Sequence, residues 1–177
     1  MPKVSKIYLA GPGVFRPDSL EWGRRLNRAC SALGLAGLYP LDGEIPGEMT
    51  SKASTRCWIF ANNCNLIRQA DAVLADLRAF RSACEPDSGT AFEVGFAYAL
   101  GKPVWLWLPD CKAGSEMISR LPCYKSDTGW IDADGLLVED FGVPINLMLW
   151  DAASGVSFDP EPESVLAALA AWIQKNQ

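Results

Sequence analysis

The stretch EPDSGTAFEVG, from Glu85 to Gly95, holds the residue best suited to chemistry, the carboxylate of Glu93. Thr90 precedes Glu93 by three residues, which is the spacing of a capping box at the start of a helix. A carboxylate near a helix N-terminus also stays ionised and is a suitable nucleophile toward the C1′ atom of a sugar. The spacing alone favours the cap, and both interpretations stay open until other residues are considered.

Three further side chains could assist such a nucleophile. Asp76 ends an apolar run and Asp87 lies six residues before Glu93, so either carboxyl group could help a leaving base to depart. The structural alternatives are an Asx turn at Asp76 and a helix cap at Asp87. Tyr8, in the first apolar run, is either a buried aromatic residue or a donor that orients a carboxylate.

The composition excludes several other chemistries. The chain has no histidine, which rules out Ser-His-Asp and Cys-His mechanisms and most zinc hydrolases. A net charge of −5 argues against nucleic acid as a partner. Gly11-Pro12-Gly13 does not complete a dinucleotide fingerprint, and six cysteines without a CxxC pair predict neither a disulfide framework nor a zinc site. We therefore expect chemistry based on carboxylates, with no metal and no cofactor.

The same features predict where the protein works. Scattered cysteines are typical of thiols in a reducing cytoplasm. No apolar run approaches the ~20 residues of a membrane span, and the opening residues, MPKVSKIYLAGP, lack the long apolar region of a signal peptide. We expect a cytoplasmic protein that does not bind membranes.

Apolar runs of strand length alternate with amphipathic segments of helical length along the chain. The predicted strands are residues 6–11, 37–42, 71–77, 102–108 and 155–158. The predicted helices are residues 19–34, 55–70, 90–101 and 163–175, with a short one within 144–152. Residues 109–140 are predicted to be irregular. The alternation predicts one α/β domain over residues 1–177, with a mainly parallel five-stranded sheet covered by helices on both faces.

Several of the candidate residues fall at the ends of predicted strands. The first strand ends at Gly11 and the third at Asp76, while Asp87 lies in the loop before the helix of Glu93. In a parallel sheet, ligands bind beyond the carboxyl ends of the strands. We therefore expect these side chains to converge on one crevice.

Four segments carry a resemblance to a known family. They are KIYLAGPGVFRPD, GLYPLD, ADAVLADLRAFRSACEPDSGTAFEVGFAYALGKPV and FGVPINLMLWD, and they cover most of the chain from Lys6 to Asp151. Together they resemble the nucleoside 2-deoxyribosyltransferases, in particular those of trypanosomatids and bacteria. The block D-x-G-T-A-F-E-x-G is specific, and its order with the first-strand tyrosine and the later NLM triplet is more specific still. The resemblance implies a doubly wound, flavodoxin-like fold.

The resemblance also implies a catalytic set. Glu93 would attack C1′, expel the base and hold a covalent deoxyribosyl ester, which a second base attacks with net retention of configuration. Tyr8 would hold the glutamate, and Asp87 would bind the deoxyribose hydroxyl groups. Asn146 in the NLM triplet, with Met148 beside it, would be lent to the 5′ end of the sugar in a neighbouring subunit.

The substrate-binding set is completed by Gly11, Asp76, Asn63 and Gly89. This chain departs from its relatives at two positions: it has Asn62 or Asn63 where some carry an aspartate, and Gly43-Glu44 where they place a glutamine. An amide cannot supply the proton that a leaving base takes up, so Asp76 or a water would supply it. The choice between purines alone and purines with pyrimidines stays open.

The expected substrates are 2′-deoxynucleosides and free nucleobases, exchanged during base salvage by a homo-oligomer built from dimers, up to a hexamer. Two alternatives stay open. Water could replace the second base and give an N-glycosidase of deoxynucleosides or their 5′-monophosphates, for which Arg16 is the nearest cation in the first loop. The protein could also be a non-catalytic nucleotide-binding module in which Glu93 only caps its helix.

Overall fold

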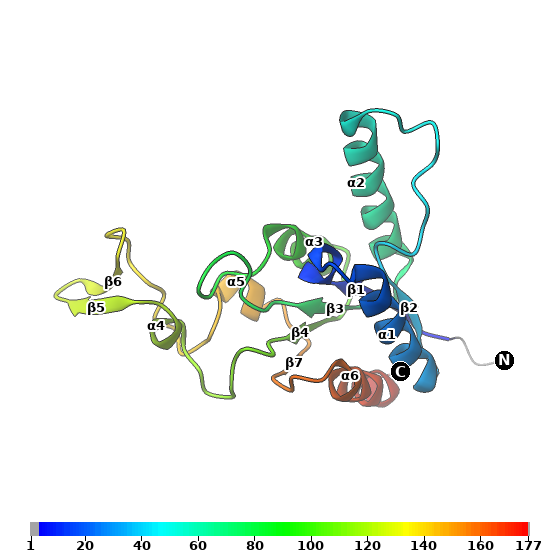
Figure 1. Cartoon of the computed structure of the whole chain (residues 1–177). Helices are drawn as coiled ribbons and strands as arrows, with labels where there is room; N and C mark the ends of the chain where they lie inside the picture. The colour runs from blue at the N-terminus through cyan, green and yellow to red at the C-terminus, as the bar shows by residue number, and fades with distance from the viewer. Residues whose placement is uncertain (1–3, 177) are drawn as a thin grey trace.

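The computed structural model describes residues 4–176, and its centre is a sheet of five parallel strands (Figure 1). In sheet order these are β2 (Ala36–Leu38), β1 (Lys6–Ala10), β3 (Ala72–Asp76), β4 (Val104–Trp107) and β7 (Gly155–Ser157). The chain passes from β1 to β2 on one side and then through β3 on the other, so the winding reverses beside β1. The predicted doubly wound, parallel sheet is confirmed, and a ligand crevice is expected where β1 and β3 end.

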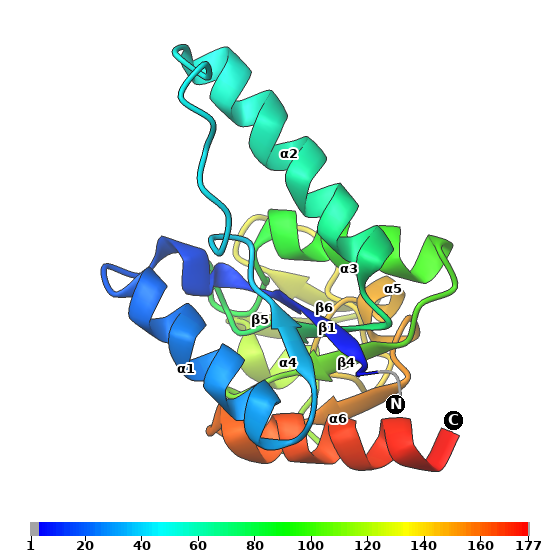
Figure 2. The ribbon, with the colours of Figure 1, turned by 90° about the vertical axis from the view of Figure 1, so that its right-hand side faces the viewer.

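Two pairs of helices pack against the two faces of the sheet, although the second of them along the chain contacts it only through its C-terminal end and projects away from the body (Figure 2). In chain order they are α1 (Ser19–Ala32), α2 (Lys52–Gln69), α3 (Ser88–Ala99) and α6 (Pro162–Asn176). Successive side chains of a strand point to opposite faces. Ile7 and Leu9 of β1 therefore pack toward α1 and α6, whereas Tyr8 packs toward α2 and α3. Both faces are apolar because neither is open to solvent.

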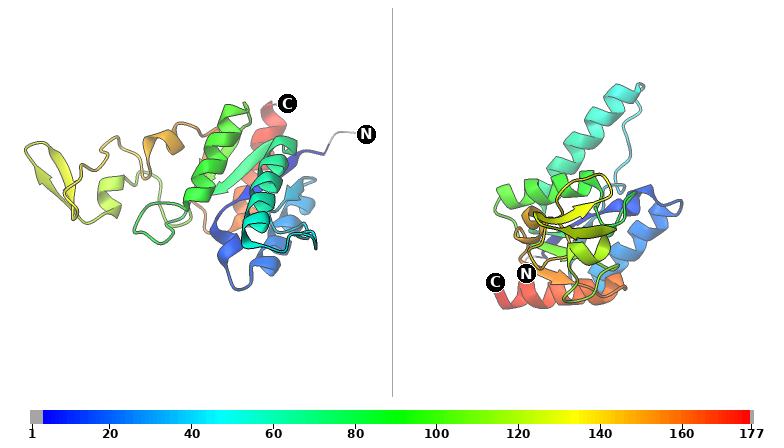
Figure 3. Two further views of the ribbon diagram at one scale, coloured as in Figure 1. Left: turned by 90° about the horizontal axis from the view of Figure 1, so that it is seen from above. Right: turned by 90° about the vertical axis from the view of Figure 1, so that its left-hand side faces the viewer.

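The segment between β4 and β7 leaves the sheet and forms an arm (Figures 1 and 3). The arm contains α4 (Met117–Arg120), β5 (Cys123–Ser126) and β6 (Gly129–Asp132), after which α5 (Leu147–Trp150) returns and packs against α3 (Figure 1). Strands β5 and β6 pair antiparallel with each other, in a sheet of their own. The prediction of an irregular segment over residues 109–140 was wrong, because strands of four residues with mixed polarity give no recognisable periodicity.

Local chemistry explains two shifted boundaries. Strand β2 ends at Leu38, earlier than predicted, because Pro40 has no N–H to donate to a neighbouring strand. Helix α2 begins at Lys52 rather than residue 55, since the Ser51 hydroxyl accepts a hydrogen bond of 3.1 Å from the Ser54 amide and caps it.

The structure also bears on membranes, thiols and metals. Within residues 4–176, no helix combines the length and apolar character needed to cross a bilayer. All six cysteines are free thiols. The part of the chain that the structure describes contains no group of three His, Cys, Asp or Glu side chains placed to hold a metal ion.

Candidate active site

Glu93 meets Tyr8 on the face of the sheet that α2 and α3 cover. The Tyr8 side chain leaves β1, and its hydroxyl donates a hydrogen bond of 2.6 Å to Glu93 Oε1. Asn63 of α2 donates to the same oxygen through Nδ2, at 3.4 Å. No described residue donates to the other oxygen, Oε2. The glutamate is therefore held by one oxygen and presents the other, which suits a carboxylate nucleophile.

The surroundings of Glu93 bring its pKa close to neutrality. Burial raises the pKa to about 7, the Asp87 carboxylate adds to the rise, and the hydrogen bonds from Tyr8 and Asn63 oppose it. The sequence predicts that the helix N-terminus keeps Glu93 ionised; Glu93 is the sixth residue of α3, where burial opposes that effect of the helix dipole. Burial and the charge of Glu93 raise the pKa of Tyr8, so its hydroxyl stays protonated as a donor.

Asp87, rather than Thr90, is the N-cap of α3. Its Oδ2 accepts hydrogen bonds from the Thr90 amide at 2.9 Å and from the Thr90 hydroxyl at 3.0 Å. The predicted capping box between Thr90 and Glu93 was therefore wrong, because an aspartate three residues earlier satisfies that amide. Glu93 is free of a capping role and faces Tyr8 instead.

Gly89 makes room for the cap. A Cβ atom at Gly89 would lie 2.9 Å from Asp87 Oδ2, so a larger residue would displace that carboxylate. The structure places Gly89 beside the Asp87 carboxylate. Its predicted role in substrate binding remains a prediction.

Asp76 ends β3 on the opposite face of the sheet from Tyr8, where Arg78 binds it. The Arg78 backbone N–H donates to Asp76 Oδ1 at 3.2 Å, which forms the Asx turn considered for this strand end. The guanidinium Nε lies 2.9 Å from Oδ1 and 2.8 Å from Oδ2, and Nη2 lies 2.8 Å from Oδ2. Burial raises the pKa of Asp76, although the hydrogen bonds and charge of Arg78 oppose the rise.

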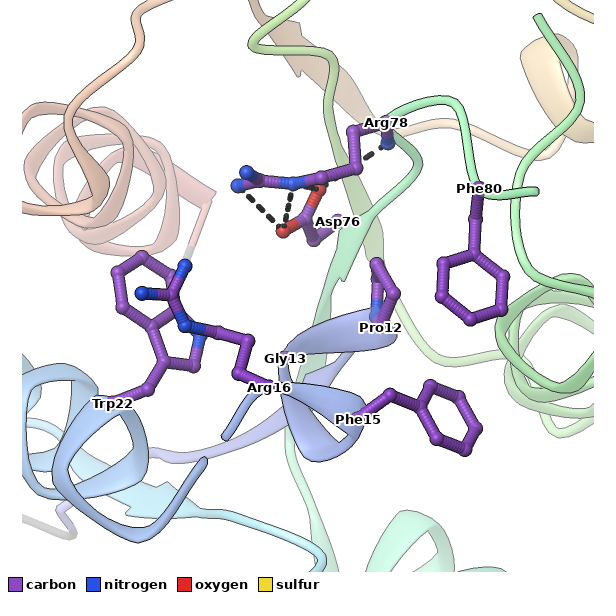
Figure 4. Close-up of a pocket in the computed structure, with 8 residues that line it drawn as sticks. All are labelled: Pro12, Gly13, Phe15, Arg16, Trp22, Asp76, Arg78 and Phe80. Atoms are coloured by element: carbon purple, nitrogen blue, oxygen red, sulfur yellow. Dashed lines mark hydrogen bonds and ion pairs between the residues drawn. The ribbon is translucent and has the colours of Figure 1, made fainter. Parts of the chain in front are cut away.

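A cavity of about 200 Å³ opens beside this ion pair (Figure 4). Its lining residues are Pro12, Gly13, Phe15, Arg16, Trp22, Asp76, Arg78 and Phe80. The rings of Phe15 and Phe80 stack with their centroids 5.2 Å apart. On the other side of the cavity, the Arg16 guanidinium lies 4.6 Å from the centroid of Trp22. The cavity therefore combines flat aromatic surfaces with two guanidinium groups.

Gly11 joins β1 to this cavity. It lies between β1 and the short helix η1 (Pro12–Phe15) with a φ of +149°, a conformation that favours glycine. A Cβ atom there would lie 2.7 Å from Asp76 Cβ. Gly11 therefore lets the end of β1 approach the end of β3, which fixes the position of Asp76 beside the cavity.

The structure brings the predicted residues together in two clusters at one edge of the sheet. Tyr8, Asn63 and Glu93 form one cluster, with Asp87 near it, and Asp76 forms the other with Gly11. Sequence reasoning missed Arg78, Trp22 and the two phenylalanines that line the cavity. One signal was available in the run Asp76-Leu-Arg-Ala-Phe80, which starts at the last residue of a buried strand. Every second residue of this run is charged or aromatic, and these residues line the cavity.

Among the residues that the structure describes, Asn146 and Met148 make no hydrogen bond with either cluster, and Met148 lines a separate pocket against α3. Asn146 caps α5 by accepting a hydrogen bond of 3.0 Å from the Met148 amide, and its Nδ2 donates to Glu139 Oε1 at 2.5 Å. Glu139 Oε2 also accepts from the Leu147 amide at 2.9 Å. The Met148 side chain is among the most exposed large apolar groups, at 73%. The predicted roles of these two residues remain predictions.

The sequence of this chain is similar to those of known proteins over most of its length. Residues 7–148 match the family described as nucleoside 2-deoxyribosyltransferase. An uncharacterised protein of Schizosaccharomyces pombe is 34% identical over 159 residues, which span 82% of this chain and 75% of that protein.

Two solved structures are similar in both sequence and fold. A 2-deoxyribosyltransferase of Leishmania mexicana is 34% identical with a TM-score of 0.69, over 94% of this chain and 97% of that one. A 2-deoxyribosyltransferase of Bacillus psychrosaccharolyticus is 26% identical with a TM-score of 0.57, over 88% of this chain and 87% of that one.

Proposed function

Because the chain belongs to the nucleoside 2-deoxyribosyltransferase family, we propose that it exchanges the base of 2′-deoxynucleosides through a covalent deoxyribosyl ester on Glu93. The observation that carries the proposal is the geometry of this carboxylate, whose Oε1 is held by Tyr8 while Oε2 is free. The chain has no histidine, so no imidazole competes for the role of nucleophile or base.

In the first step, Glu93 Oε2 attacks C1′ and the bond from C1′ to the base nitrogen breaks. The electron pair of that bond leaves with the base, and the carboxylate supplies the pair for the new ester bond. Tyr8 keeps its hydrogen bond to Oε1, which orients the attacking oxygen along one direction. Asp87, whose charge acts on Glu93, would bind a sugar hydroxyl group in this proposal.

In the second step, a different base attacks C1′ from the face that the first base left. The ester bond breaks, its electron pair returns to Glu93, and the proton of the incoming base passes to solvent. Two displacements at one carbon restore the original configuration. A carboxyl group with a pKa of about 7 is ionised for attack in a large part of the molecules at neutral pH.

The cavity beside Asp76 supplies a place for the base in this proposal. Its stacked phenylalanine rings and Trp22 offer the flat apolar surfaces that a heteroaromatic ring requires. We further propose that the exchange serves salvage of free bases in the cytoplasm, and that Asn146 of a neighbouring subunit binds the 5′-hydroxyl. The exposure of Met148 beside Asn146 supports a surface that a second copy covers.

Base exchange is tested by incubating the protein with 2′-deoxyinosine, with and without adenine, and separating the products by chromatography. Formation of 2′-deoxyadenosine supports the proposal, and failure of exchange with every pair of bases overturns it. Continuous release of hypoxanthine without an acceptor would identify hydrolysis instead, and a 2′-deoxynucleoside 5′-monophosphate as donor shows whether a phosphate is required.

The covalent step is tested by mass spectrometry of the protein mixed with 2′-deoxyinosine alone. An increase equal to one deoxyribosyl group on the peptide containing Glu93 is expected. Glu93→Ala should abolish both the adduct and the exchange, whereas Glu48→Ala, at an exposed loop position, should change neither. If Glu93→Ala still exchanges bases, another residue must be the nucleophile.

A further inference from the structure

We propose that Arg78, held in place by Asp76, makes the cavity selective for 6-oxopurines by donating hydrogen bonds to O6 and N7 of hypoxanthine or guanine. This inference rests on the proposed function, since it assigns the base of the exchanged deoxynucleoside to the cavity. It concerns which bases are accepted and how the leaving base is stabilised.

Arg78 engages both carboxylate oxygens of Asp76. Oδ1 accepts the backbone N–H of Arg78, the single Nε–H is shared between Oδ1 and Oδ2, and Nη2 forms an ion pair with Oδ2 at 2.8 Å. One residue therefore contacts both carboxylate oxygens, through its backbone N–H, its Nε–H and the charge of Nη2. Asp76 is therefore an anchor for the guanidinium, and it does not read the base itself.

The anchored guanidinium keeps donors to spare. Arginine carries five N–H groups, and Asp76 engages Nε and Nη2, which leaves both N–H groups of Nη1 and one of Nη2. The Arg78 guanidinium also lies 5.1 Å from the ring centroid of Trp107, which helps to fix its plane. A fixed guanidinium recognises two neighbouring acceptors more sharply than a flexible ammonium group.

The second cation of the cavity reinforces this pattern. Arg16 uses Nε and Nη2 to bind Asp18, at 2.8 Å and 2.9 Å, and its Nη1 remains available. Among the side chains that line the cavity, the charged donors are Arg16 and Arg78, and the one carboxylate is already engaged. The lining therefore favours a ligand edge that presents acceptors.

The O6 and N7 atoms of a 6-oxopurine form such an edge, with two acceptors side by side. A guanidinium binds this pair in a bidentate manner, and a good bidentate contact discriminates against a wrong base by roughly 10- to 100-fold. Adenine places its N6 amino donor where O6 would be, so it directs a donor toward a donor. Pyrimidines lack N7, so they cannot present this pair of acceptors.

The same contact would stabilise the leaving group. When the C1′–N9 bond breaks, its electron pair leaves a purine anion whose charge spreads over the ring nitrogens and O6. A guanidinium beside O6 and N7 stabilises that charge without transferring its own proton, because arginine does not deprotonate in proteins. The anion takes up a proton from solvent on release, so the step requires no carboxylic acid at Asp76.

The test compares the single-turnover rate of base release from 2′-deoxyinosine and from 2′-deoxyadenosine, without an acceptor base. The wild-type protein should release hypoxanthine at least tenfold faster than adenine. Arg78→Lys keeps the positive charge but loses the guanidinium fork, and it should reduce this ratio roughly tenfold. Arg24→Gln, on the exposed face of α1, is the control and should leave the ratio unchanged.

Removing Arg78 alone could leave Asp76 buried without a partner, so a second variant guards against misfolding. The double variant Asp76→Asn/Arg78→Gln replaces the ion pair by two neutral amides that can still bond to each other. It should release both bases at similar rates and should melt cooperatively. A wild-type protein without a preference for hypoxanthine, or a folded double variant that keeps the preference, overturns the inference.

Calorimetric binding of free hypoxanthine and free adenine makes the inference testable independently of turnover. The wild-type protein should bind hypoxanthine at least tenfold more tightly, and Arg78→Lys should lose that difference. If no deoxynucleoside releases its base, the proposed function fails while the binding result still decides the role of Arg78. Equal binding of the two bases overturns the role of Arg78 even where exchange occurs.

Discussion

The Tyr8 hydroxyl lies 2.6 Å from Glu93 Oε1, although 85 residues separate the two in the sequence. The contact joins a central strand of the sheet to the helix that covers it, and it selects which carboxylate oxygen is free. Because it is a hydrogen bond to the ionised form, it also counters the effect of burial on the pKa of Glu93. The rate of base exchange should therefore respond to pH in a way that depends on this one contact.

Tyr8→Phe should move the pH dependence of glycosyl-enzyme formation to higher pH. The ionised carboxylate is the reactive form, so the wild-type rate should rise with pH and level off above about 7. Loss of the hydrogen bond raises the pKa of Glu93 further, and a bond to a charged group is worth ~1.5–3 kcal/mol, or about one to two pH units. Single-turnover rates between pH 5 and 9 measure the shift, and an unmoved profile would contradict the role of Tyr8.

Asp87→Asn should move the same profile in the opposite direction. The Asp87 carboxylate raises the pKa of Glu93 by repulsion, so its removal lets Glu93 ionise at lower pH. Asparagine is as good an N-cap as aspartate, and α3 should keep its start. An unchanged melting temperature together with a shift to lower pH confirms the electrostatic effect, while a shift to higher pH excludes it.

Gly11→Ala should destabilise the protein through both backbone strain and a clash. The residue has a φ of +149°, and its new Cβ atom would lie 2.7 Å from Asp76 Cβ. A loss of ~2–3 kcal/mol in the free energy of unfolding is expected from the two effects together. Gly34→Ala is the matched control, because Gly34 has a φ of +71° and a Cβ atom added there would meet no atom within 4 Å. Equal losses in the two variants would show that Asp76 does not resist the change.

Mixing two inactive variants should restore activity if Asn146 serves a neighbouring subunit. Glu93→Ala lacks the nucleophile and Asn146→Ala lacks the residue lent to the sugar, yet a hybrid dimer of the two contains one intact site. Random pairing should give about a quarter of the wild-type sites after joint denaturation and refolding. Refolding each variant alone is the control. A mixture as inactive as its components would place Asn146 in its own protomer's site or outside catalysis.

The sequence predicted the helices and strands, because these depend on local patterns of apolar residues. It also predicted the candidate residues that lie at the ends of strands. Alternation of apolar strands with amphipathic helices predicted the five-stranded parallel sheet, and this is confirmed. The predicted start of α3 was wrong because Asp87 and Thr90 both fit a cap, and in the structure it is Asp87 that accepts the Thr90 amide N–H and caps the helix. The backbone angles decide which of the two residues caps the helix, and the spacing of residues in the sequence does not reveal these angles.

The cavity could not be predicted because its residues come from separate parts of the chain. Trp22 lies on α1 and Phe15 on η1, while Arg78 and Phe80 follow β3. Each of them alone is an ordinary surface or core residue. Their meeting depends on the order of β1 and β3 in the sheet and on the close approach at Gly11.

The hairpin of β5 and β6 makes no ladder with the five-stranded sheet, and this separates its local stability from that of the core. The backbone amide hydrogens of the hairpin should exchange with deuterated water when the hairpin alone opens. Those of β1 and β3 should exchange only when the whole protein unfolds. Exchange at Tyr124 and Trp130 therefore reports what touches the arm. Slower exchange there at high protein concentration, with β1 and β3 unchanged, would be the signature of a second copy bound to the arm.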